Sequence, residues 1–308
     1  MRTLDFIVDS FPIQGGGLSP FVRAAREIYA FTPEQACAAL GSEDGLRACR
    51  LLGLLRQQVR RPPAVTPSRF SPVDEEKTRP SLDDETPSLC PQLSSPLTPE
   101  DAAFLRRVYP ALLRARNARA PQLPPSYIIT EDCALAACVL ALCGQRLGEP
   151  RYIQAAQRAV SFLISLAPVQ GFPPAFAPVS PLLAHASCGG AAALSLALLT
   201  LGRGEGMGEY AASGLRLLSA ALHAFVREDG LPMFTMPDSA AFFPRVPAIY
   251  ASELPSPAAL VVHALRLAEE LRPDAHFGEG IEAIWQAAAP GVHAQPIACA
   301  GLIDAMMH

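Results

Sequence analysis

From residue 100 to its end, the chain repeats one pattern: a helix-length segment with an apolar stripe, then a connection. Phe104, Val108 and Leu112 show the spacing, because side chains four residues apart lie on one face of a helix. The pattern predicts an all-α fold of stacked helical hairpins with segments of about 12 to 18 residues. The predicted helices start near residues 99, 131, 150, 188, 209, 257, 278 and 296.

Two all-α architectures are built from such hairpins, an open solenoid and a closed α/α toroid. A solenoid shows a fixed repeat period, whereas the predicted helix starts are unevenly spaced. We therefore predict an α/α toroid, whose loops at one rim build the site. Leu231–Thr235, after the turn signal Asp229-Gly230, and the following Phe242–Tyr250 predict a short β-hairpin inserted between two helices.

The first hundred residues divide into two parts. Residues 1–60 are predicted to hold the N-terminal helices of the toroid, and Thr32 before Pro33 with Gln35 in third place is a helix-start signal. Residues 61–99 contain nine prolines, which predict a linker or mobile loop. Residues 100–308 would then form the main toroid segment.

Charge and hydropathy exclude several partners. The net charge is −4 and the pI about 5.9, so no basic face for nucleic acid is expected. The uncharged stretch Ser161–Gly202 has its best apolar run at Ala191–Leu201, shorter than a bilayer requires, so we expect no membrane span. Met1–Asp5 does not resemble a secretory signal, which predicts a cytoplasmic protein.

The eight cysteines show no metal or redox spacing. None forms a C-x-x-C pair, and Cys133, Cys138 and Cys143 follow at steps of five, which turn successive side chains about 140° apart on a helix. We read the cysteines as reduced core residues and expect no metal. No glycine-rich phosphate loop between a strand and a helix is present, and no cofactor is expected.

Several stretches, in order along the chain, match a known sequence pattern. They are Thr3–Ile7 with Ile13–Gly17, Glu27–Gln35 with Ala39–Gly41, Tyr127–Glu131 with Leu147–Tyr152 and Ala155-Ala156, Glu228–Gly230, Arg245–Pro247 and Leu254–Ser256. On these stretches the chain resembles the C-terminal helical part of the YyaL-like, spermatogenesis-associated-protein-type family, whose members carry an N-terminal thioredoxin-like domain. The resemblance implies a fold like that of six-hairpin glycosidases and sugar 2-epimerases.

The departures from the family pattern are as informative. We expect no thioredoxin-like domain in this chain. Only about ten residues separate Gly17 from Glu27, so the resemblance implies a toroid with one hairpin fewer. A Glu-Asp pair of the family falls on Gly189-Gly190. Positions at which the family has residues able to do polar chemistry thus carry small residues in this chain.

Sugar chemistry needs paired carboxylates or a positioned acid and base. The candidates are Glu131, Asp132, His185, Glu253 and His263. Glu131 and Asp132 open a helix, where the simpler role is as helix-dipole partners. His185 reads more simply as a hydrogen-bonded loop residue and His263 as a packed one. Glu253 is the best single candidate for a ligand contact.

Three functions follow from these observations. The first, which we favour, is a catalytically degenerate homologue that binds a small sugar-like ligand or a partner. The second is a carbohydrate-active enzyme, glycosidase-like or epimerase-like, with acid–base roles on Glu131, Asp132, His185 or Glu253. The third is one subunit of a split system whose thioredoxin-like part is separate, with a protein partner on the apolar face left by the missing hairpin.

Overall fold

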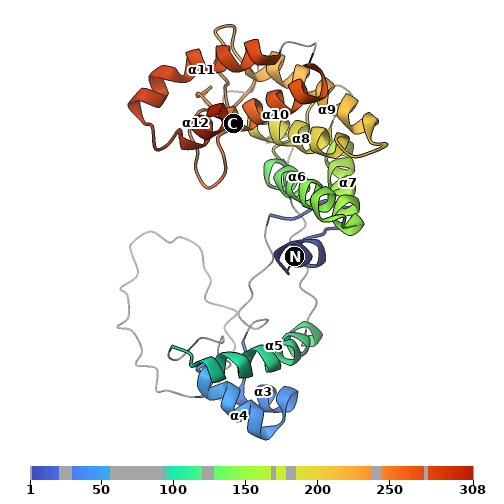
Figure 1. The fold of residues 1–308 in the computed structure, drawn as a ribbon, viewed down its shortest axis with the longest axis vertical. Helices are drawn as coiled ribbons and strands as arrows, with labels where there is room; N and C mark the ends of the chain where they lie inside the picture. Colours follow the sequence, from blue (N-terminus) through green and yellow to red (C-terminus); the bar gives the residue numbers. More distant parts are fainter. Residues whose placement is uncertain are drawn as a thin grey trace, which may run out of the picture. The chain divides into compact units, whose positions relative to one another are not determined.

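The computed structural model describes residues 2–20, 30–55, 93, 96–119, 128–167, 171–177, 185–237, 245–273 and 277–307. The chain forms two compact units (Figure 1). The first contains residues 1–22 and 124–308, and the second contains residues 23–123. The predicted division into 1–60, 61–99 and 100–308 stays a prediction, and nearly all of 61–99 lies outside the described residues.

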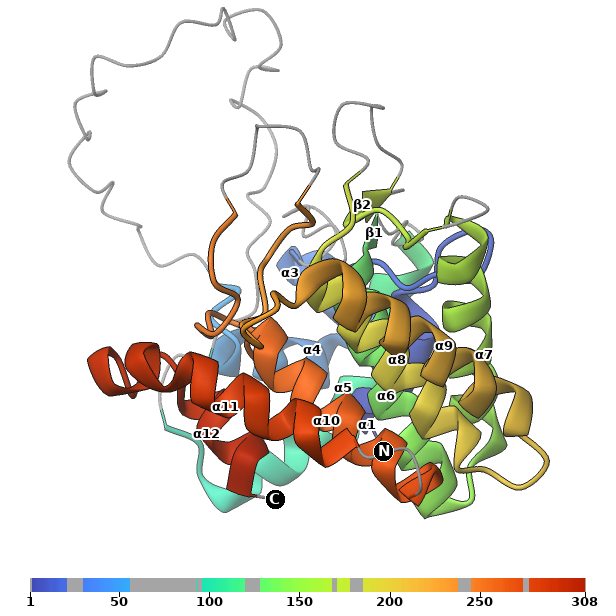
Figure 2. The same cartoon turned by 90° about the horizontal axis from the view of Figure 1, so that it is seen from above.

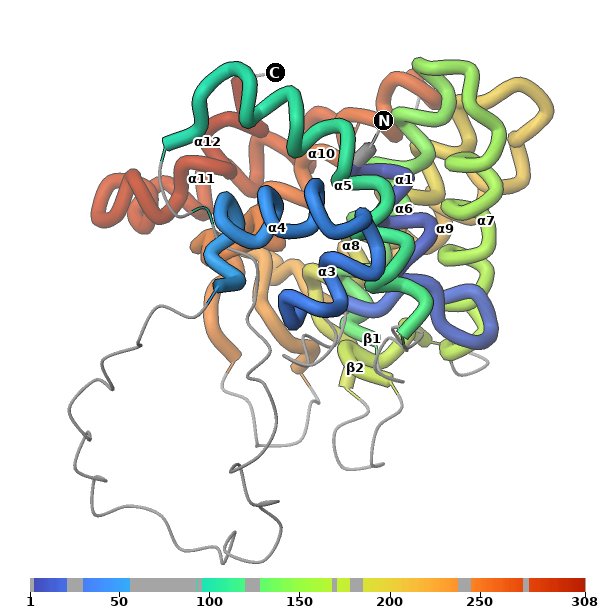
Figure 3. Tube along the Cα trace, turned by 90° about the horizontal axis from the view of Figure 1, so that it is seen from below, coloured from blue at the N-terminus to red at the C-terminus, as the bar shows by residue number. Residues whose placement is uncertain are grey.

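The second unit is a small helical assembly of α3 (Pro33–Leu40), α4 (Ser42–Leu51) and α5 (Pro99–Arg119), seen side by side in Figure 3. The predicted start of α3 is confirmed. Thr32 Oγ1 accepts the Gln35 N–H at 3.2 Å, and the Gln35 side chain accepts the Thr32 N–H at 3.0 Å. This capping box satisfies two backbone donors that the helix cannot pair itself.

The first unit contains the remaining helices and the one short sheet of the described residues. Its helices are α1 (Arg2–Ser10), α6 (Thr130–Leu147), α7 (Pro150–Ser165), α8 (Cys188–Gly202), α9 (Gly208–Phe225), α10 (Pro257–Leu271), α11 (Phe277–Ala294) and α12 (Ala300–Met307).

These helices pair in sequence order into hairpins arranged in two layers. α6 packs on α7, α8 on α9 and α10 on α11, while α8 also lies between α6 and α10 (Figure 2). α6, α8 and α10 thus form an inner layer, and α7, α9 and α11 an outer one. In α8 every residue from Cys188 to Leu201 except Leu196 is buried, as its dense leucines predicted. The all-α hairpin arrangement of an α/α toroid is confirmed.

α1 is held against α7 by polar contacts. The buried Tyr152 hydroxyl donates to Asp5 at 2.7 Å, and Arg151 forms an ion pair with Asp9 at 3.0 Å. The segment after α1 returns to α6, where the Leu18 N–H donates to the Cys133 thiol at 3.3 Å. The N-terminal residues are therefore part of the first unit.

Most predicted helix starts lie within a residue of the observed ones, because caps and prolines are local signals. The last one is wrong: α12 begins at Ala300, and Pro296 opens a turn in which Cys299 N–H bonds back to the Gln295 carbonyl. α11 extends through Pro290 to Ala294.

The predicted β-hairpin is present in reduced form. Within the described residues it consists of isolated antiparallel bridges that join Val226 to Pro232 and Met233 to Pro247. Residues 238–244 lie outside the description. A sheet that the sequence did not predict pairs β1 (Ile128–Ile129) with β2 (Phe176–Ala177) in antiparallel register. Strands of two residues are too short to show a period of two.

Within the described part of the chain, no helix is both long enough and apolar enough to cross a membrane.

Candidate functional site

The N-terminal ends of α6, α8 and α10 are tied together by the segments between them, and we call this end of the first unit the rim. Thr130, the first residue of α6, donates its N–H to the Ala175 carbonyl at 2.9 Å. The Ala175 N–H in turn bonds to the His185 carbonyl at 2.8 Å. The segment around β2 therefore links the start of α6 to the start of α8.

The hairpin segment makes the second link of the rim. The Cys188 N–H at the start of α8 donates to the Phe234 carbonyl at 3.1 Å, and the Ala258 N–H in α10 donates to the Ala248 carbonyl at 3.0 Å. Two buried serines cap these helices. Ser187 Oγ accepts from Gly190 and Ser256 Oγ accepts from Ala259. The rim is thus a hydrogen-bonded platform at the positive ends of the inner helices.

The side chain of Glu131 lies across the first turn of α8. A Cβ atom built on Gly189 would lie 2.5 Å from Glu131 Cδ and 2.7 Å from Oε1, and still closer to Oε2. These separations are far below van der Waals contact. Gly189 therefore provides the space that the Glu131 carboxyl group occupies, and any other residue there would displace it.

Burial at this position changes the acidity of Glu131. Desolvation, followed by the negative charge of Asp132, raises the pKa of Glu131 to about 7. The pKa of Asp132 is also raised, first by burial and then by the charge of Glu253. The three carboxyl groups thus form an interacting series, with Glu131 partly protonated at neutral pH.

The thiols next to this cluster are not activated. Cys188, which precedes Gly189, is fully buried, and desolvation followed by the charge of Glu131 raises the pKa of its thiol to about 12. Burial raises the pKa of the Cys133 thiol to about 11. Both thiols stay protonated at neutral pH and act as packing groups. Among the described residues no cluster of His, Cys, Asp and Glu could hold a metal ion.

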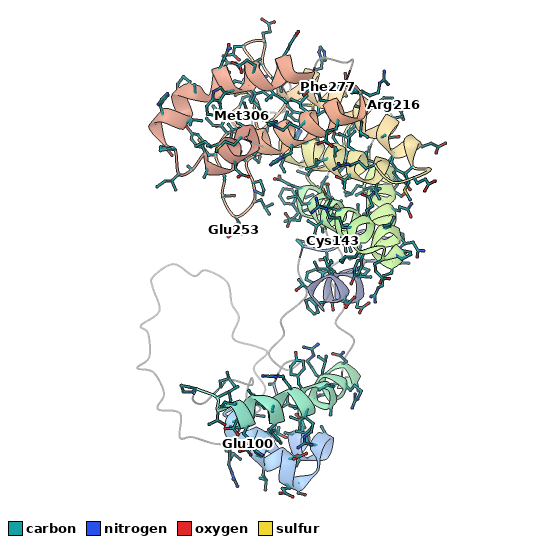
Figure 4. All side chains as sticks on the ribbon, viewed as in Figure 1. Glu100, Cys143, Arg216, Glu253, Phe277 and Met306 are labelled. Atoms are coloured by element: carbon teal, nitrogen blue, oxygen red, sulfur yellow. The ribbon has the colours of Figure 1, made fainter. Side chains whose placement is uncertain are left out.

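Three of the predicted site residues therefore influence one another through their charges. Glu131 and Asp132 open α6, and Glu253 is exposed on the loop before α10, where Figure 4 labels it. His185 lies on the rim through its backbone, and its side chain is partly buried. His263 lies in the second turn of α10 and is partly buried. The roles of all five residues stay predictions.

Sequence reasoning missed Gly189 as a part of the site. The Gly189-Gly190 pair was read as a loss of polar positions, whereas Gly189 accommodates a carboxyl group from another helix. The signal available was a pair of glycines at the start of a helix, where glycine lowers helix stability and so calls for a packing reason.

A separate groove lies beside the outer helices. It has a volume of about 850 Å³ and combines an apolar floor from α9 and α11 with charged side chains of the turn after α9. Arg227 and Asp229 in this turn form an ion pair at 2.6 Å. None of the three rim carboxylates lines this groove.

No protein-family model matches the sequence, and no curated protein matches it significantly. The resemblance to the thioredoxin-domain-containing family therefore stays a prediction.

Several solved structures share the helical arrangement at low similarity. A GH76 α-mannanase of Bacteroides thetaiotaomicron has 12% identity and a TM-score of 0.47, over 62% of this chain and 56% of that chain. The Lin0763 protein of Listeria innocua has 14% identity and a TM-score of 0.44, over 62% and 52%. An inactive variant of the α-1,6-mannanase GH76A of Salegentibacter sp. HEL1_6, in complex with α-1,6-mannotetrose, has 12% identity and a TM-score of 0.38, over 62% and 54%.

The matched part spans only a little over half of each of these proteins. At such identities and TM-scores no activity transfers to this chain.

Proposed function

We propose that the rim is a carbohydrate site and that Glu131 is the general acid of a glycoside-hydrolysing reaction. The observation that carries this proposal is the carboxyl series Glu131, Asp132 and Glu253, in which Glu131 has a pKa of about 7. A carboxyl group with this pKa is partly protonated at neutral pH and can donate its proton to a leaving group.

The reaction divides between two carboxyl groups. Glu131 passes its proton to the glycosidic oxygen as the bond between that oxygen and the anomeric carbon breaks. A water molecule supplies the new oxygen, and the Asp132 carboxylate takes the proton that this water loses. Glu253 contributes negative charge that favours the developing positive charge on the sugar ring.

This proposal reverses the order of our first two hypotheses. The sequence favoured a degenerate homologue because polar positions of the family are small here. The contact with Gly189 supports the enzyme instead, since a small residue at that position makes room for a carboxyl group. A carboxyl group whose pKa is strongly raised by burial is common at functional sites.

Sugar binding without turnover is the second candidate, and one observation favours it. The Glu131 carboxyl group packs against the backbone of Gly189, where it also serves as a partner for the positive end of α8. In this reading Glu131 is structural, and Glu253 is the ligand contact. A protein partner at the face of the missing hairpin stays a prediction.

The test is hydrolysis of a tetrasaccharide panel by the purified chain: cellotetraose, maltotetraose, xylotetraose and α-1,6-mannotetrose. Products are separated by anion-exchange chromatography, and binding is measured by isothermal titration calorimetry. We expect Glu131→Gln to lower kcat at least about a hundredfold, the low end of the range for a general acid, while Kd changes little. Glu149→Gln, at the N-cap of α7 and beyond the far end of α6, is the matched control and should keep full activity.

Two outcomes contradict the enzyme. Binding by the wild-type chain without any product supports the second candidate. Turnover that survives in Glu131→Gln shows that another group provides the proton.

A further inference from the structure

Two phenylalanine side chains of the rim are exposed to solvent. Phe176 is 47% exposed and Phe234 is 41% exposed. Their neighbours Ala177, Met233 and Thr235 are buried. Each ring is exposed between or beside buried neighbours, so both phenylalanine rings point away from the core.

The backbones that carry these rings are fixed on the rim. Phe176 pairs with Ile129, two residues before Glu131. The Phe234 carbonyl accepts the Cys188 N–H at 3.1 Å, and the Phe234 N–H donates to the Val246 carbonyl at 2.9 Å. The backbone of Phe176 is thus bonded to a residue two positions from Glu131, and the backbone of Phe234 to the residue next to Gly189.

The other aromatic residues of the loops are committed elsewhere or lie outside the described residues. The Phe172 ring packs edge to face on Phe225 at a centroid distance of 5.3 Å. Tyr250 is also 41% exposed, but its hydroxyl faces α11, 3.3 Å from a Cβ built on Gly291. Phe242 and Phe243 fall outside the description. Among the described candidates, Phe176 and Phe234 alone combine exposure with attachment to the starts of α6 and α8.

We propose that Phe176 and Phe234 are stacking residues that hold two pyranose rings of an oligosaccharide beside the start of α6 and of α8, next to Glu131. A pyranose has a face of C–H groups, and covering an aromatic ring with that face removes apolar surface of both from water. Phenylalanine has no polar group, so covering an exposed ring with the apolar face of a sugar is favourable. This inference rests on the proposed function and adds that the substrate has at least two linked pyranose units.

The test combines binding with a signal from each ring. The chain is labelled with 4-fluorophenylalanine, and the ¹⁹F resonances of positions 176 and 234 are assigned from Phe176→Leu and Phe234→Leu. We expect both resonances to shift on saturation with the tetrasaccharide of the panel that binds best. Phe176→Ala and Phe234→Ala should each weaken binding at least about tenfold, a loss of about 1.4 kcal/mol.

Phe6→Ala is the matched control, because Phe6 is 45% exposed on α1 and contacts Phe11 instead of the rim. It should bind with the wild-type Kd, and thermal melts of all variants check that they are folded. A wild-type Kd in both rim variants, with unmoved resonances, overturns the stacking role while leaving the proposed function intact. A wild-type chain that binds no tetrasaccharide overturns both proposals.

Discussion

The close approach of Glu131 to Gly189 leads to a prediction with an internal control. In Gly189→Ala the new methyl group would overlap the Glu131 carboxyl group, since its Cβ would lie 2.5 Å from Cδ. The carboxyl group is the far end of a flexible side chain, so it moves and the helix stays in place. Moved into water, Glu131 loses the desolvation that raises its pKa.

The expected magnitude follows from that pKa. The pKa of Glu131 should fall from about 7 toward its unperturbed value of 4.5. A change of this size corresponds to about 3 kcal/mol of differential stabilisation of the protonated form. The melting temperature should change little, because alanine gains up to about 1 kcal/mol over glycine in a helix and offsets part of the repacking cost.

Gly190→Ala is the control on the same turn of α8. Its Cβ would lie 3.1 Å from Ser187 Oγ and 3.2 Å from Thr130 Cγ2, with no Glu131 atom among its nearest neighbours. A shift of a few tenths of an ångström accommodates it, so the pKa of Glu131 should stay near 7.

The assay is a pH titration followed by NMR of ¹³C-labelled glutamate carboxyl groups, with the Glu131 signal identified by its loss in Glu131→Gln. A titration near pH 7 that persists in Gly189→Ala would refute the argument that Gly189 keeps the carboxyl group desolvated. If the pKa of Glu131 fell equally in Gly190→Ala, the effect would not be specific to Gly189.

Three further predictions concern stability. Because the pKa of Glu131 is raised in the folded state, its protonated carboxyl group contributes stability below about pH 4.5, and this contribution is lost as pH rises through 7. In urea unfolding between these pH values, the wild-type chain should therefore lose about 3 kcal/mol of stability relative to Glu131→Gln. A difference that stays constant with pH would contradict this prediction. Tyr152→Phe removes the hydrogen bond to Asp5 and should lower the stability of the first unit by about 1 to 3 kcal/mol in chemical denaturation. Thr32→Ala breaks the capping box with Gln35 and should cost about 1 kcal/mol, measured as faster amide exchange in α3; unchanged exchange would contradict it.

The helices were predictable because their signals are local. The Thr32 capping box, the proline at the start of α10 and the leucines of α8 each specify structure within a turn or two of the chain. The order of the hairpins followed from the lengths of helices and connections. These features do not depend on what the segments contact, so the sequence alone determined the all-α class.

The sequence also indicated Glu131, Asp132 and Glu253 as candidates, but it did not show which other residues lie next to them in space. Glu131 and Gly189 are far apart in the chain, and only the packing of α6 on α8 brings them together. The two-residue strands that join Ile129 to Phe176 likewise form through long-range pairing, with too few residues for a pattern.

The acidity of Glu131 depends on tertiary structure for the same reason. A carboxyl group at the first turn of an exposed helix has an ordinary pKa or a lowered one, because the helix dipole favours its charge. Here the neighbouring helix removes water from it and reverses the direction of the shift. Local sequence thus determined where most of the helices begin, while tertiary packing decided which side chains lost their water and so which of them can carry chemistry.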